Sequence, residues 1–77
     1  MSITIDKNLA KDLINTKLRI IDEEIYEILN KWAVDSVDEL VDGCRKGKYD
    51  ECENDAIDLT NLRDRRKELI HLLKGMQ

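Results

Sequence analysis

The sequence predicts an all-α protein, an antiparallel hairpin of two long helices joined by a short helix. Three observations support this prediction. The 77-residue chain has no proline and only three glycines, so few residues interrupt a helix. Hydrophobic residues make up 42% of the chain and charged residues 39%, and that hydrophobic share is too high for a disordered protein. Apolar residues recur at steps of three and four in two long segments, which is helical spacing. The length predicts a single domain, residues 1–77.

The first long helix is expected at about residues 6–33. Its apolar seam has alternating steps of four and three, at Ile14, Leu18, Ile21, Ile25, Ile28 and Trp32. Further apolar residues widen the seam on both sides, at Leu9, Ala10, Leu13, Ile20 and Leu29. A stripe this broad is typical of a helix in a bundle. Asp6 is the expected N-cap, with Ile5 as a hydrophobic staple onto Ala10. Trp32 is expected to pack under the short helix.

The short helix is expected at about residues 37–46, after a break at residues 33–35. Ser36 and Glu39 have the spacing of a capping box, in which each side chain satisfies a free backbone N–H. Gly43 weakens this helix by about 1 kcal/mol relative to alanine. Gly47 is expected to end it in the left-handed conformation.

The second long helix is expected at about residues 50–74, with Gly75 as its terminator. Acidic residues lie in its first turns and basic residues in its second half, as the helix dipole favours. Its seam again alternates steps of three and four, at Leu59, Leu62, Arg66, Leu69 and Leu73. Arg66 is a cation at a seam position. Its stem can pack while the guanidinium reaches the rim, or it pairs with an acid from a partner helix.

The seams are wider than two helices can cover for each other, which predicts association. We expect a homodimer in which two hairpins form a four-helix bundle; the alternative is a partner protein that supplies the missing helices. The expected interface comprises Leu18, Ile21, Ile25, Ile28, Trp32, Leu62, Arg66 and Leu69.

Cys44 and Cys52 have seven residues between them. A structural zinc site needs four closely spaced ligands, and this chain has two cysteines and one distant histidine, His71. We therefore expect reduced, partly buried thiols. A disulfide across the turn at Gly47 is the alternative.

The sequence predicts no enzyme, no cofactor and no metal site. Glu68 and His71 form the Glu-x-x-His half-motif of di-iron bundles, but the seam register turns both side chains away from the core. No glycine-rich phosphate loop or nucleophile motif is present.

The net charge of −4 is unevenly spread, with −6 over residues 34–58 and +3 over residues 59–77. Duplex DNA binding is disfavoured, because phosphate neutralisation needs a basic surface. The one basic cluster, residues 62–67, is expected to complement its own helix dipole. No long apolar run and no secretory signal is readable, so a cytoplasmic location without membrane contact is expected.

Two family resemblances bear on function. Residues 2–6 alternate polar and apolar residues ahead of a helix, which resembles the opening of ribbon-helix-helix regulators and antitoxins. However, they include no lysine or arginine, Asp6 would face phosphate, and the following helix is too long for that family.

The second resemblance covers more of the chain. The long helix to Trp32, then Ser36-x-x-Glu39-Leu40, then Gly47-Lys48 and a leucine-rich helix, is similar to small prokaryotic helical-hairpin proteins, some of them antitoxin-like. This resemblance is one of fold. From the surplus of apolar seam and the lack of a catalytic motif, we expect a non-enzymatic interaction module that self-associates. The alternative is an antitoxin-like regulator that binds a partner protein, with or without DNA contact.

Overall fold

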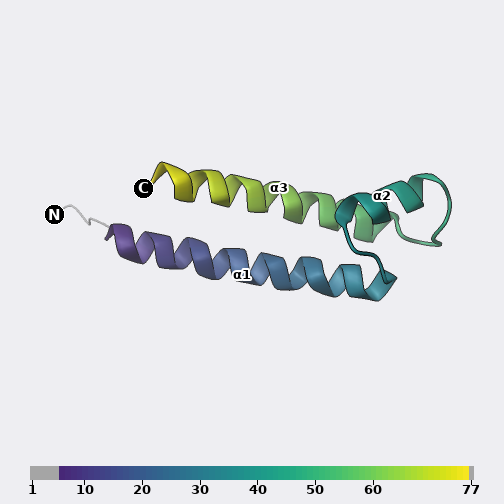
Figure 1. The fold of residues 1–77 in the computed structure, drawn as a ribbon, viewed down its shortest axis with the longest axis horizontal. Helices are drawn as coiled ribbons and strands as arrows, with labels where there is room; N and C mark the ends of the chain where they lie inside the picture. Colours follow the sequence, from purple (N-terminus) through teal and green to yellow (C-terminus); the bar gives the residue numbers. More distant parts are fainter. Residues whose placement is uncertain (1–5, 77) are drawn as a thin grey trace.

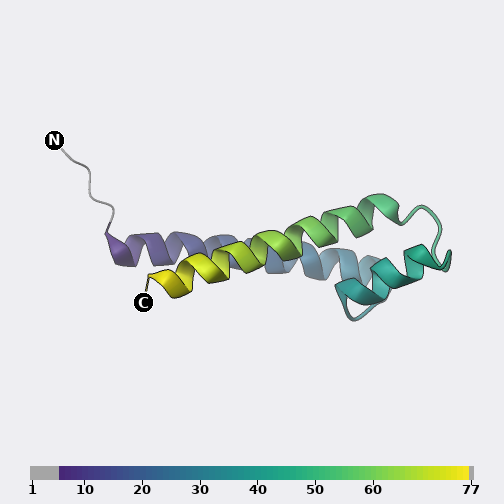
Figure 2. The same ribbon diagram turned by 90° about the horizontal axis from the view of Figure 1, so that it is seen from above.

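The computed structural model describes residues 6–76 and confirms the all-α hairpin. Its helices are α1 (Lys7–Trp32), α2 (Val37–Arg45) and α3 (Glu53–Gly75). The long helices α1 and α3 run antiparallel side by side, and α2 lies at the closed end (Figure 1). The view from above places α2 to one side of the two long helices (Figure 2). The strand-like segment 2–5 and the Ile5 staple lie outside the described residues.

The molecule is only two helices thick, 21 Å and 17 Å along its two shorter axes. One helix with its side chains is about 10–12 Å across, so over most of their length the two long helices have no further layer beside them. The radius of gyration is 16.0 Å, against about 11–12 Å for a compact chain of this length. The outward side of each long helix is therefore surface. None of the helices within residues 6–76 combines the length and the hydropathy of a transmembrane span.

The predicted ends of α1 are confirmed. The Asp6 carboxylate accepts a hydrogen bond of 3.1 Å from the Asn8 amide and caps the first turn. The helix ends where Ala33 takes the left-handed conformation, with φ 54°. The Val34 amide then donates to the Leu29 carbonyl at 3.0 Å, the Schellman pattern. Alanine thus occupies a position that usually holds glycine.

The capping of α2 also follows the sequence. The Ser36 hydroxyl accepts from the Glu39 amide at 3.1 Å, and the Glu39 carboxylate accepts from the Asp35 amide at 2.8 Å. Gly47 is left-handed, with φ 72°, and the Lys48 amide reaches back to the Gly43 carbonyl at 2.8 Å. The predicted glycine cap is confirmed.

The start of α3 differs from the prediction by three residues. Glu51 has a left-handed φ of 54°, which interrupts the expected helical turn. Cys52 is the N-cap and makes no side-chain capping bond. The chain turns tightly here because Cys52 is joined back to α2.

Cys44 and Cys52 form a disulfide, with their Cα atoms 6.0 Å apart. This distance is within the usual range for a bridged pair. The expectation of two free thiols is therefore wrong, and the alternative across the Gly47 turn describes the molecule. The two residues flank one bend, so a short bridge is geometrically available.

The core is concentrated at the closed end, where all three helices meet. Leu40 of α2 and Leu59 of α3 are fully buried with Cys52, and Val34 completes the cluster. Trp32 packs against this cluster, as expected for a residue under the short helix. Further along the hairpin, Ile14 and Ile21 are the buried residues of α1.

Gly43 has a packing role that cannot be predicted from its helix propensity. A Cβ atom built at this position would overlap the Tyr49 ring, lying 2.8 Å from Cδ2 and closer still to Cε2. The Tyr49 ring is held in turn by an edge contact with Trp32, with 5.6 Å between ring centroids. The glycine therefore makes room for the aromatic pair.

Replacing Gly43 with alanine is expected to destabilise the protein by about 1–2 kcal/mol. Helix propensity alone would give a gain of about 1 kcal/mol, but overpacking against Tyr49 outweighs it. Urea unfolding measures the change. In a Tyr49→Ala background, the same substitution should stabilise the protein, because the obstructing ring is gone. A gain in the native background would contradict the close packing.

Reduction of the disulfide is expected to lower the free energy of unfolding by about 2–3 kcal/mol, the loop-closure value for so short a ring. Urea unfolding with and without a phosphine reductant measures it. A Cys44→Ser/Cys52→Ser double variant should not respond to the reductant. Two iodoacetamide adducts on unreduced, denatured protein would show that the bridge does not form.

Candidate functional site

The residues predicted as a dimer interface lie along the contact between α1 and α3 of one chain. Only 2% of the surface of Ile21 is exposed. The predicted positions Leu18, Ile25, Ile28, Leu62 and Leu69 are half-buried. The leucine seam of α3 thus covers much of what a second copy was expected to cover. A second chain could reach Ile21 only by opening the hairpin, while an interface at the half-buried positions stays a prediction.

Arg66 finds its partner inside the hairpin. Its Nε donates to the Asp22 carboxylate of α1 at 2.7 Å, and both side chains are substantially exposed. One of the two predictions for Arg66 was an ion pair with an acidic residue of a partner helix. The acidic residue is Asp22, which lies in the same chain. An exposed ion pair of this kind contributes at most about 1 kcal/mol, so its main effect is to align the two helices.

Asp55 ties the ends of α1 and α3 together beside the core. Its Oδ2 accepts from the Trp32 indole at 2.7 Å and from the Lys31 ammonium at 2.9 Å. These bonds, first from Lys31 and then from Trp32, lower the pKa of Asp55 below its ordinary value, against a smaller opposing effect of desolvation. The polar edge of Trp32 is thus satisfied while its ring packs on the core. The predicted interface residue Trp32 therefore serves the closed end of the hairpin.

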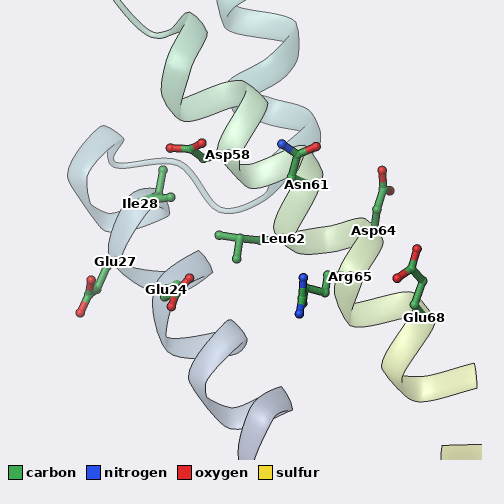
Figure 3. Close-up of a pocket in the computed structure, with 9 residues that line it drawn as sticks. All are labelled: Glu24, Glu27, Ile28, Asp58, Asn61, Leu62, Asp64, Arg65 and Glu68. Atoms are coloured by element: carbon green, nitrogen blue, oxygen red, sulfur yellow. The ribbon is translucent and has the colours of Figure 1, made fainter. Parts of the chain in front are cut away.

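A groove runs between α1 and α3, with a volume of about 590 Å³ (Figure 3). Leu62 and Arg65 project from α3 toward α1, and Ile28 lines the groove from α1. Asn61 lines it as well, together with five carboxylates: Glu24, Glu27, Asp58, Asp64 and Glu68. We call this feature the acidic groove; its floor is apolar and its walls carry a net charge of −4.

The acidic groove lies on the side of α3 away from α2. Arg63 of α3 donates to Asp38 of α2 at 2.7 Å, so Arg63 marks the side that α2 covers. Arg65 lines the groove, and two positions along a helix correspond to a rotation of about 200°. The short helix thus covers one side of the hairpin and leaves the opposite side open.

The open end of the hairpin carries exposed apolar side chains. Leu9, Leu13 and Ile20 of α1 are 53%, 60% and 40% exposed. Their spacing of four and seven places them on one helix face, and we call them the apolar strip. The sequence showed these residues only as flanks of the seam. Their steps of four and seven form a second heptad pattern, at positions different from those of the buried seam. This second pattern is the sequence signal that could have distinguished them from the seam residues.

The apolar strip and the acidic groove belong to one surface. Positions seven apart lie on almost the same side of a helix, so Leu13 and Ile20 continue the wall that Glu27 forms on α1. On α3, the exposed Leu72 continues the wall that Arg65 forms. We call the combined surface the uncovered face. It is apolar toward the open end and acidic toward the closed end.

The half-motif of Glu68 and His71 lies at the surface, since both side chains are exposed as the register predicted. Glu68 is part of the acidic groove wall. Within the described residues, no group of three or more histidine, cysteine or acidic side chains is placed to hold a metal ion. With no metal-binding cluster among the described residues, we take the uncovered face as the candidate functional site.

Comparison with known proteins gives one family. The family model described as "Uncharacterized protein MJ0235 family" matches residues 2–77. No curated protein matches the chain, and no solved structure matches it. The match confirms a resemblance to uncharacterised proteins over nearly the whole chain, and it says nothing about antitoxins.

The hydrogen bonds that Asp55 accepts from Lys31 and Trp32 predict a pH-dependent contribution to stability. Because folding lowers the pKa of Asp55, the contribution is present above the unfolded pKa of about 3.9 and is lost as the pH falls through the folded pKa. Urea unfolding should therefore show Asp55→Asn less stable than the native protein at pH 6, with the difference shrinking below about pH 4. A difference that is constant with pH would contradict a charge-dependent tie.

Proposed function

The chain belongs to the Uncharacterized protein MJ0235 family, and because that description names no activity, we propose a function from the surface. The protein is a non-enzymatic helical interaction module, and two copies pair through the apolar strip. The observation that carries this proposal is the exposure of Leu9, Leu13 and Ile20 on one face of α1. Single exposed leucines are common on protein surfaces, whereas an aligned row is typical of an interface.

The charge pattern favours an antiparallel pairing of the two α1 helices. Beyond Ile20, the two positions that would continue the strip are Glu23 and Glu27. A parallel pair would place each glutamate against its own copy, which is destabilising. An antiparallel overlap puts Leu9 of one copy against Ile20 of the other and leaves the glutamates beyond the contact.

Charged residues beside the strip also favour antiparallel pairing of the two α1 helices. In an antiparallel helix pair, the residues along one side of the contact strip face the equivalent side of the second copy, running in the opposite direction. Asp12 and Arg19 are both such positions, seven residues apart on one side of the strip. The overlap brings Asp12 of each copy near Arg19 of the other, an attractive pair. Leu72 of α3 lies on the same face, so four helices meet over the overlapped open ends.

The proposed contact is small, with three strip residues from each copy. Association has a large entropic cost, and small interfaces are typical of weak or transient complexes. We therefore expect a dissociation constant on the order of tens to hundreds of micromolar. The antitoxin-like alternative from the sequence would place a partner protein on the same strip, and it is the outcome to consider if copies do not pair.

Sedimentation equilibrium up to about 500 μM tests the pairing. The native protein should approach twice the 9.0-kDa monomer mass, with a melting temperature that rises with concentration. Leu13→Glu should remain monomeric, because pairing would bury an unpaired charge. It should also keep the fold, because Leu13 is exposed in the hairpin.

Tyr26→Glu is the matched control. Tyr26 is 66% exposed on the same helix, but it lies about 120° around the axis from Ile20, so this variant should pair as the native protein does. A native protein that stays at 9.0 kDa over the whole range would overturn the proposal of self-association.

A further inference from the structure

We propose that the acidic groove is a docking site for a basic amphipathic helix of another protein. The site differs from the apolar strip in both position and chemistry. The strip lies toward the open end of α1, whereas the groove lies between α1 and α3 toward the closed end (Figure 3).

The shape of the groove suits a helix. Its walls are two antiparallel helices, and its apolar floor has one contribution from each, Ile28 of α1 and Leu62 of α3. Helices commonly bind by laying an apolar face into such a hydrophobic groove between elements. The α3 wall extends from Asp58 to Glu68, about 15 Å at 1.5 Å per residue. A docked helix of about ten residues would span it.

The charge of the groove defines the polar face of that helix. Five carboxylates and one cation, Arg65, line the groove. The ion pairs found in the described residues use Asp22, Asp38, Asp42 and Asp55, none of which lines the groove. Among residues 6–76, the groove carboxylates thus form no ion pair, and Arg65 is the one cation that lines the groove with them. Lysine and arginine beside the apolar anchors would supply the missing charge, whereas nucleic acid phosphates would be repelled.

A second copy of the chain is a poor occupant. In a twofold pair the same surfaces meet, so an acidic groove would face an acidic groove. Two of the four cations in the basic cluster of α3, Arg63 and Arg66, are already bonded to Asp38 and Asp22. The antiparallel overlap at the strip also leaves both grooves outside the contact. The proposed occupant is therefore a different protein, with leucine-like anchors three or four residues apart and basic flanks.

A labelled synthetic peptide tests this site. The probe is an 18-residue helix of leucine, lysine and alanine with leucines at steps of three and four, and the matched probe has glutamate in place of lysine. Fluorescence anisotropy is measured on the Leu13→Glu variant as well as the native protein, so that failure of self-pairing and failure of docking are distinguishable. The lysine probe should bind both proteins with a micromolar dissociation constant, and the glutamate probe should bind at least tenfold more weakly.

Charge reversals locate the binding. Glu24→Lys, in the groove wall, should weaken binding of the lysine probe by about tenfold or more. Glu53→Lys makes the same change of net charge in the first turn of α3, outside the groove, and should weaken it less than about twofold. Circular dichroism checks that both variants fold. Equal effects of the two reversals, or no binding of the lysine probe at several hundred micromolar, would overturn the proposal.

Discussion

The packing of the short helix against one side of α3 is the contact on which the rest of the structure depends. Leu40 and Leu59 are both fully buried there, and only at this end do three elements surround a core. Elsewhere the two long helices bury each other along a single seam. Because α2 is nine residues long, it can cover one side of the hairpin only at the closed end. The opposite side is left open, and the candidate functional surface is a direct consequence.

Polar contacts set the alignment of the hairpin more than its stability. Asp55 joins α3 to Lys31 and Trp32 of α1, and Arg66 joins it to Asp22 three turns further along. Exposed ion pairs are weak individually, but each requires a particular sliding position of one helix on the other. The Trp32 indole adds a further constraint, because a partly buried N–H that loses its acceptor is destabilising. The apolar seam permits several registers, and the polar pairs favour one.

Much of the fold could be predicted from the sequence because its signals are local. The Asp6 cap, the Ser36–Glu39 box and the Gly47 terminator each act within one helical turn, and all three are present. The start of α3 and the disulfide could not be predicted in this way, since they depend on how the 46–52 connection folds back on α2. The role of Gly43 is similarly non-local. Its propensity describes an isolated helix, whereas the deciding contact is the ring of Tyr49.

The candidate site was harder to predict, because heptad spacing does not identify which partner covers a residue. Ile21 and Ile20 are neighbours in sequence, yet the hairpin buries the first and exposes the second. Only the observed rotation of α1 against α3 separates a seam that is buried within the chain from a strip that stays exposed. The same limit applies to the groove, since Glu24 and Asp58 are distant in sequence and become neighbours through the hairpin.

The division of the uncovered face by charge separates the two proposed contacts. Glu23 and Glu27 lie just beyond the apolar strip and oppose any extension of it toward the closed end. Glu27 is also a wall of the acidic groove. A basic helix docked in the groove would neutralise this carboxylate, which the antiparallel overlap leaves outside the contact between strips. On the proposed arrangement, the two contacts therefore use separate parts of the uncovered face, and one can form without the other.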